Sequence, residues 1–118
     1  MTSPRLNLIV IRSLDTVRLV AFYQMLGISF VEEQHGSGPV HCAADLDGLV
    51  LEVYPAKTAD EVNKTIRLGF EIEDVAATVN ALRASGVEIA NDVKQSQWGL
   101  RAVVRDCDGR TVELVQRA

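Results

Sequence analysis

The sequence repeats one pattern of residues at a distance of about half its own length. In each copy an aspartate precedes an apolar helical stripe, a glycine ends the stripe, an Asp-Gly pair follows, and a glutamate then interrupts an apolar run. The offsets between the copies lie between 59 and 61 residues in a chain of 118 residues. A spacing this regular indicates two copies of one supersecondary unit. The matched pairs are Asp15 and Asp74, Gly27 and Gly86, Asp47-Gly48 and Asp108-Gly109, and Glu52 and Glu113.

The first copy, residues 5–55, has the pattern of a strand, a helix and three further strands. Apolar residues from Leu6 to Ile11 predict the first strand. A helical stripe follows and ends at Gly27, a residue type that readily adopts the left-handed conformation found after helices. Residues 28–33 predict another strand, and the two apolar runs around Asp47-Gly48 predict a β-hairpin. The members of the stripe are Leu19, Phe22, Tyr23 and Leu26.

The second copy, residues 65–117, has the same order of elements. Residues 66–72 predict a strand, residues 74–86 a helix and residues 87–90 another strand, while Pro55 to Lys64 forms a polar linker between the copies. A unit of this length is too small to bury its helix and sheet well by itself. We therefore expect one domain over residues 1–118, with an α+β fold of two tandem βαβββ modules, each a curled mixed sheet covered by a helix.

The two faces of each predicted sheet differ in polarity. Because side chains alternate along a strand, the hairpin register places Ala43 opposite Glu52. It also places His41 and Tyr54 on the same face as Glu52, while the apolar hairpin residues share the other face. The second copy gives the same division, with Glu113 opposite the apolar residues. We expect the helices to cover the apolar faces and the two mixed faces to enclose a pocket.

Composition excludes several classes of partner. The formal charge is −4, the isoelectric point is near 5.1, and basic residues are scattered, so no nucleic acid partner is expected. No apolar run approaches the roughly 18 residues of a membrane span, and the start of the chain does not resemble a secretory signal. Cys42 and Cys107 form neither a CxxC pair nor a disulfide framework. We expect a soluble, cytoplasmic protein without a membrane partner.

These motifs together resemble the vicinal oxygen chelate superfamily, which includes glyoxalase I, bleomycin-resistance proteins, extradiol dioxygenases and epimerases. The resemblance covers nearly the whole chain and implies the tandem βαβββ fold. It also implies a homodimer, in which each pocket is often completed by modules from both chains. The motifs are Asp15 with Phe22-Tyr23 and Leu26-Gly27, Asp74-Val75 with Leu82 and Ser85-Gly86, Trp98-Gly99-Leu100-Arg101, and Asp106 to Gly109 before Val112-Glu113-Leu114.

The resemblance also implies where a metal would bind. Members that hold a divalent metal use one ligand on the first strand and one on the last strand of each module. Glu52 and Glu113 stand at the last-strand positions, whereas Leu8 and Arg67 stand at the first-strand positions, which usually carry histidine or glutamine. Leucine and arginine are not metal ligands, so no metal cofactor is expected at the standard site.

One hypothesis replaces the metal with Arg67. Its guanidinium group stays charged and can bind carboxylates in a bidentate manner, so it could lie between Glu52 and Glu113. Those glutamates are then the candidate catalytic residues beside a pocket for a small, partly apolar organic ligand. The alternative is a purely structural ion cluster without a ligand. The predicted pocket residues are Arg67, His41, Tyr54, Trp98, Leu8, Val10 and Arg101.

A second hypothesis keeps a metal through His41. On the predicted hairpin, His41 is a diagonal neighbour of Glu52, and Glu113 would complete a site for zinc, nickel, manganese or ferrous iron. The protein would then be a metal-dependent lyase, isomerase or dioxygenase of the glyoxalase type. His41 as an ordinary pocket-wall residue is the alternative. Two interpretations of Trp98 also stay open. Its indole stacks on a ligand as part of the pocket wall, or it packs at the rim of a subunit interface.

Overall fold

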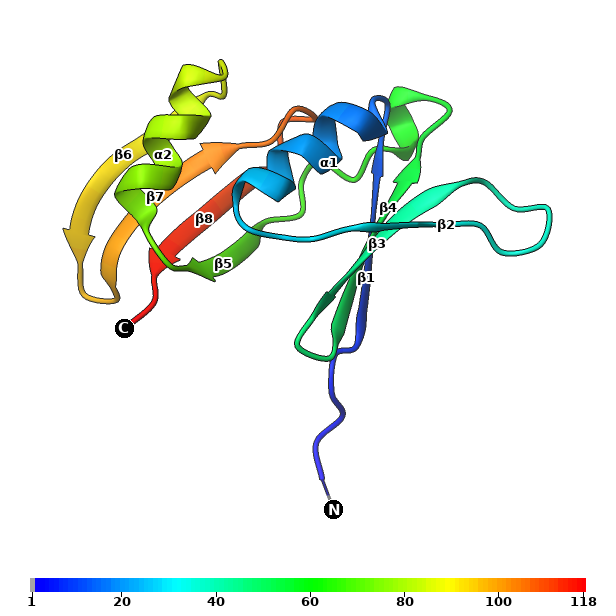
Figure 1. Cartoon of the computed structure of the whole chain (residues 1–118), viewed down its shortest axis with the longest axis horizontal. Helices are drawn as coiled ribbons and strands as arrows, with labels where there is room; N and C mark the ends of the chain where they lie inside the picture. Colours follow the sequence, from blue (N-terminus) through cyan, green and yellow to red (C-terminus); the bar gives the residue numbers. More distant parts are fainter. Residues whose placement is uncertain (1) are drawn as a thin grey trace.

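The computed structural model describes residues 2–118 and contains two βαβββ modules in tandem (Figure 1). A single turn of 3-10 helix, η1 (Ala59–Glu61), lies in the linker between them. The first module consists of β1 (Leu8–Ser13), α1 (Thr16–Met25), β2 (Val31–Glu33), β3 (His41–Leu46) and β4 (Leu49–Pro55). The second consists of β5 (Leu68–Ile72), α2 (Val75–Ala84), β6 (Ile89–Ser96), β7 (Gly99–Arg105) and β8 (Thr111–Gln116). The predicted α+β fold is confirmed.

Each module forms one four-stranded mixed sheet. The first sheet has the order β1-β4-β3-β2 and the second has the equivalent order β5-β8-β7-β6. In each sheet the first and last strands of the module run parallel, and the other neighbours are antiparallel. Helix α1 packs on β1 and β4, and α2 packs on β6, β7 and β8 (Figure 1). The face of each sheet away from its own helix is called its open face below.

Both helices begin and end where the sequence predicts. The carboxylate of Asp15 accepts a hydrogen bond from the Arg18 amide at 3.1 Å, and that of Asp74 accepts one from the Ala77 amide at 3.0 Å. These bonds satisfy amides that have no partner inside the helix. Gly86, after α2, has a φ of 89°, a conformation that favours glycine. The stripes of both helices belong to one cluster of buried apolar side chains from the two modules.

Several predicted strand boundaries differ from the structure, including the start of β5, which begins at Leu68 rather than Ile66. β1 begins at Leu8 rather than Leu6, because its parallel partner β4 extends only far enough to pair residues 8–13. β2 begins at Val31 rather than Ile28, because the Ile28 amide donates instead to the Tyr23 carbonyl and closes the end of α1. β6 continues to Ser96, well beyond residue 90. This part of the strand is not evident in the sequence, because its residues are mostly polar. Polar residues are tolerated there because β6 lies at the edge of the sheet and has a neighbouring strand on one side only.

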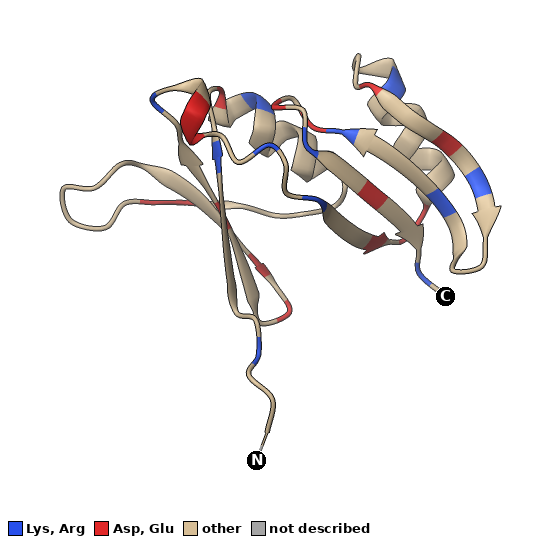
Figure 2. Cartoon of the chain, turned by 180° about the vertical axis from the view of Figure 1, so that it is seen from behind, with Lys and Arg blue, Asp and Glu red and all other residues tan. Residues whose placement is uncertain are grey.

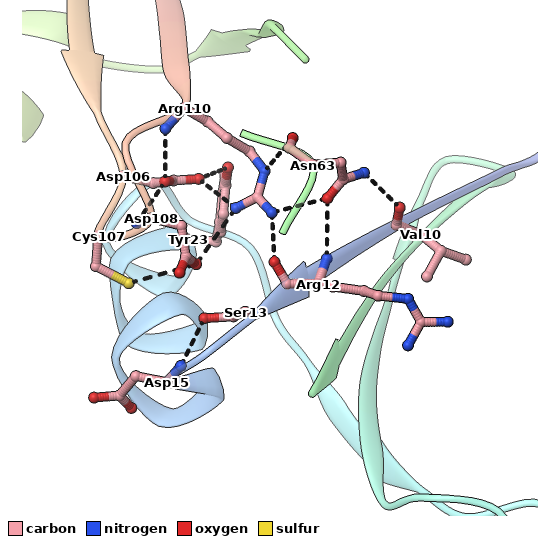
Figure 3. A network of polar contacts seen from close by, with 10 residues as sticks. All are labelled: Val10, Arg12, Ser13, Asp15, Tyr23, Asn63, Asp106, Cys107, Asp108 and Arg110. Carbon is pink, nitrogen blue, oxygen red and sulfur yellow. Dashed lines mark hydrogen bonds and ion pairs between the residues drawn. The ribbon is translucent and has the colours of Figure 1, made fainter. Parts of the chain in front are cut away.

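A buried polar network joins the two modules (Figure 3). Arg110, which is fully buried, pairs with Asp106 at 3.2 Å and donates to the Asn63 side chain at 3.0 Å and to the Arg12 carbonyl. The Tyr23 hydroxyl on α1 donates to Asp106 at 2.9 Å. Burial, and then the neighbouring Asp106 carboxylate, raises the pKa of Tyr23. The second module therefore contacts β1, α1 and the linker through one charged cluster.

No helix among residues 2–118 is long and apolar enough to cross a membrane.

Candidate functional site

The open face of the first sheet carries five of the predicted residues, which are Leu8, Val10, His41, Glu52 and Tyr54. The hairpin register is as predicted, with Ala43 opposite Glu52. The His41 ring stacks on the Tyr54 ring, with centroids 4.1 Å apart and planes 10° apart. The guanidinium carbon of Arg12 lies 5.3 Å from the centroid of the Tyr54 ring. This face is therefore a wall of aromatic and aliphatic groups, to which β1 adds Leu8 and Val10.

His41 is buried on this face and contacts two carboxylates. Its side chain is 1% exposed, and its Nε2 lies 3.3 Å from Glu33 Oε1 and 3.5 Å from Glu52 Oε2. The Nε2 of His35 lies 3.5 Å from the same Glu33 oxygen. Sequence reasoning found His41 and Glu52 but missed Glu33 and His35. Their only signal was a glutamate and a histidine two residues apart, which is common in exposed loops.

The open face of the second sheet carries Glu113 between two arginines. Arg101 on β7 and Arg67, just before β5, both pair with Glu113 Oε1, the latter at 3.2 Å. Beside this cluster lies a cavity of about 360 Å³. Aromatic, aliphatic and charged side chains thus meet at one hollow. Its lining residues are Gly69, Phe70, Glu71, Trp98, Arg101, Glu113 and Val115.

The two candidate glutamates take part in separate clusters within this chain. Glu52 contacts His41 on the first sheet, whereas Glu113 contacts Arg67 and Arg101 on the second sheet. The side chain of Arg67 is 61% exposed, and among residues 2–118 its only ion pair is with Glu113. A single centre with Arg67 between both glutamates is therefore not formed inside one chain. Among residues 2–118, the cavity beside Glu113 is lined by residues of the second module alone, so the two mixed faces do not share it.

The residues at the standard metal positions of the superfamily do not fit a metal ion. Leu8 offers no donor atom, and Arg67 offers only a cation. Glu113 is already neutralised by two guanidinium groups, which would repel a divalent ion. Of the three residues in the alternative metal hypothesis, His41 and Glu52 lie together and Glu113 lies on the other sheet.

Trp98 lies in the tight turn between β6 and β7, at the rim of the cavity. The residue is 66% exposed. Ser96 fixes the turn, because its hydroxyl accepts from the Trp98 amide at 3.1 Å and donates to the Gly99 carbonyl at 2.7 Å. An exposed indole on a fixed turn is suited both to stacking on a ligand and to packing against a second chain.

Both cysteines are free, and neither has the surroundings of a reactive thiol. Burial, followed by the carboxylates of Asp108 and Asp106, raises the pKa of Cys107 to about 11. Burial, followed by Glu32, also raises the pKa of Cys42. The sequence expectation of unpaired thiols is consistent with this geometry.

We expect Cys107 to react slowly with iodoacetamide at pH 7. Only the thiolate attacks, and a pKa raised from its ordinary value near 8.5 lowers the thiolate fraction on the order of 100-fold. The rate should rise about tenfold per pH unit up to about pH 11. Alkylation of each cysteine can be followed by peptide mass spectrometry across this range, with a small cysteine peptide as the control. A rate at pH 7 equal to that of the peptide would contradict the structure.

Comparison with known proteins agrees with the architecture. The family model described as Glyoxalase/Bleomycin resistance protein/Dioxygenase superfamily matches residues 5–114. A search of curated proteins finds no match. Among solved structures, TnmS3, an antibiotic binding protein from Streptomyces sp. CB03234, is 21% identical with a TM-score of 0.73, covering 100% of this chain and 99% of that chain.

Two further structures share the fold. Oxidase ChaP-H2 is 16% identical with a TM-score of 0.77, covering 99% of this chain and 96% of its own. A glyoxalase-related enzyme from Fulvimarina pelagi is 20% identical with a TM-score of 0.73, covering 96% of this chain and 88% of its own. At these identities the structures support the fold alone, and the family assignment rests on the match over residues 5–114. The chain belongs to the glyoxalase/bleomycin resistance protein/dioxygenase superfamily.

Proposed function

We propose that the protein binds a small, partly apolar organic molecule in the cavity on the open face of the second sheet. The observation that carries this proposal is the cavity of about 360 Å³, where Trp98 and Val115 lie beside the Arg101–Glu113 pair. Ligand sites are typically apolar hollows with a few polar groups that fix orientation. We place this function ahead of an enzymatic one because the standard metal positions do not fit a metal.

The polar pair favours a ligand that carries a hydroxyl group. The guanidinium group of Arg101 can only donate hydrogen bonds, and the carboxylate of Glu113 can only accept them. A hydroxyl group does both and so satisfies the two side chains together. Trp98 favours an aromatic body, because aromatic rings stack with offset or edge contacts. We therefore propose a hydroxylated aromatic molecule as the ligand class.

We further propose that a second copy of the chain completes this pocket. The open face of the first sheet presents Leu8, which is 47% exposed, together with the partly exposed side chains of Tyr54 and Val10. Trp98 on the second sheet is exposed as well. Apposition of the first sheet of one chain with the second sheet of its partner would bury both faces. A twofold dimer of this kind contains two equivalent pockets.

Binding of naphthol is the direct test. Naphthol offers an aromatic body and one hydroxyl group, and naphthalene lacks only the hydroxyl. We expect naphthol to quench the fluorescence of Trp98, the only tryptophan in the chain, and to bind at least about tenfold more tightly than naphthalene. Replacing Arg101→Met should remove most of that preference, because the donor is lost.

The matched control is Arg83→Met. Arg83 is also an arginine in an ion pair, with Asp92 at 2.8 Å, but this pair lies at the exposed C-terminal end of α2 and away from the cavity. We expect naphthol affinity to be unchanged in this variant. Equal binding of naphthol by the wild type and the Arg101 variant, or equal binding of naphthol and naphthalene, would rule out this ligand site.

A metal-dependent lyase, isomerase or dioxygenase remains the second candidate function. The contact of 3.5 Å between His41 and Glu52 favours it. It ranks second because Glu113, its third residue, is paired with two arginines on the other sheet. For either function we propose the cytoplasm as the location, since two free cysteines suit a reducing compartment.

A further inference from the structure

We propose that the first module holds a divalent transition-metal ion, with zinc as the best match, between Glu33, His35, His41 and Glu52. One ligand atom from each residue lies within 4.8 Å of all the others. This site differs from the standard one of the superfamily, because three of its residues come from β2, β3 and the loop between them. It also goes beyond the ligand pocket proposed above, since all four side chains belong to the first module of a single chain.

The strongest argument is the state of the His41 ring. Its Nδ1 lies 3.2 Å from the Pro39 carbonyl oxygen, which can only accept a hydrogen bond, so Nδ1 carries a proton. The Nε2 atom is buried and has no hydrogen-bond partner, because its contacts with the two carboxylates lack hydrogen-bond geometry. A buried lone pair facing two acceptors is unfavourable. A metal ion among them would satisfy all three groups.

The hydrogen bond at Nδ1 is also the usual support of a metal-binding histidine. Such histidines donate their other ring N–H to a carbonyl or carboxylate, which fixes the tautomer and the ring orientation. In His41, the group that accepts this hydrogen bond is the carbonyl of Pro39. The stacked ring of Tyr54 further restricts rotation of His41. Nε2 is therefore held in one direction, toward Glu33 and Glu52.

The distances suit a tetrahedral ion. Ligand atoms about 2.1 Å from a tetrahedral zinc ion lie about 3.4 Å from one another. The contacts from His41 Nε2 to Glu33 and Glu52 are 3.3 Å and 3.5 Å, and that from His35 Nε2 to Glu33 is 3.5 Å. Two imidazole nitrogens and two carboxylate oxygens form a donor set that suits zinc.

Charge gives an independent argument. No lysine or arginine occurs between Arg18 and Lys57, so β2, β3 and β4 contain only acidic charges (Figure 2). Among residues 2–118, the ion-pair partners of Glu33 and Glu52 are histidines alone. On the second sheet, by contrast, two arginines neutralise Glu113. Among residues 2–118, Glu52, which is equivalent to Glu113, and its neighbour Glu33 have no arginine or lysine partner. A bound metal ion would supply the missing positive charge.

The fold brings the four residues together through strand pairing. Glu33 is opposite His41 in the β2–β3 ladder, and Glu52 is opposite Ala43 in the β3–β4 ladder. His35 follows β2 in a turn closed by the hydrogen bond from the Gly38 amide to the His35 carbonyl at 3.0 Å. Three of the ligands therefore come from rigid paired strands, and the fourth comes from a short turn.

Titration of the untagged, chelator-treated protein with zinc by calorimetry tests the proposal. We expect one equivalent of zinc per chain, and intense visible absorption typical of tetrahedral coordination when cobalt replaces zinc. Replacing Glu33→Gln or His41→Ala should weaken zinc binding by about 10-fold or more. His35→Ala should weaken it too, and this variant is safe for folding because the His35 side chain is 73% exposed.

The matched control is Glu32→Gln, the same change of charge on the adjacent residue of β2, which points to the other side of the sheet. Zinc affinity should be unchanged in this variant. Absence of zinc binding would overturn the proposal. Binding that survives both the Glu33 and the His35 substitutions would also overturn it, since the ion would lie elsewhere. Naphthol binding is measured separately on the metal-free protein, because it tests the proposed ligand pocket beside Glu113 and not the metal site.

Discussion

Replacing Arg110→Met is expected to destabilise the protein by about 3–5 kcal/mol. The guanidinium group is fully buried and lies in the network of Figure 3. Its removal leaves Asp106 as a buried carboxylate without its cationic partner, with only the Tyr23 hydroxyl and two backbone amides as donors. The Arg12 carbonyl and the Asn63 side chain lose a donor as well. Most of the expected loss is the desolvation of these groups rather than the ion pair itself.

Chemical denaturation with matched thermal melts would measure this loss. For a chain of 118 residues, the expected decrease in melting temperature is roughly 10–20 °C. Arg83→Met is the matched control, because its pair with Asp92 is exposed and should contribute less than about 1 kcal/mol. Similar stabilities for the Arg110 and Arg83 variants would show that the network does not hold the modules together.

Complementation between two defective chains should restore half of the naphthol sites. If the pocket joins the second sheet of one chain to the first sheet of its partner, Arg101→Met and Tyr54→Ala damage opposite walls of the same site. Homodimers of either variant should bind weakly at both sites. In a heterodimer of the two variants, one site carries both substitutions and the other carries neither. The stoichiometry should therefore return to about half that of the wild type.

Co-expression with two different affinity tags yields the heterodimer for this measurement. Binding capacity can then be compared by calorimetry with that of each homodimer and of the wild type. A pocket formed within one chain would give two defective sites and no recovery. Normal binding by the Tyr54→Ala homodimer would show that the first sheet is not a wall of the pocket. Failure to isolate any heterodimer would contradict the proposed dimer itself.

Much of the fold could be predicted from local patterns. Asp15 and Asp74 cap the helices, Gly86 follows the second helix with a positive φ, and Ala43 lies opposite Glu52 as expected. Caps, glycine conformations and two-residue turns depend on residues close in the sequence, so the sequence records them directly. β6 was missed beyond residue 90, because an exposed edge strand does not need apolar alternation.

The candidate sites were predictable only in part. His41 and Glu52 were identified because a short hairpin links them. Glu33 joins them through pairing of β2 with β3 across a loop whose length does not determine a register. Arg101 was expected near the pocket from a resemblance, but its pairing with Glu113 depends on the antiparallel alignment of β7 and β8.

The sequence by itself determined the two βαβββ modules, their helix boundaries and the division of each sheet into an apolar and a mixed face. These features follow from periodicity and from local turn chemistry, which act over a few residues. Only the tertiary structure decided that Glu52 and Glu113 belong to separate clusters and that Arg110 is buried between the modules. Arg110 follows an Asp-Gly turn and would be assigned to the surface by its type alone. Packing of segments more than 40 residues apart, which no local pattern encodes, placed it in the interior.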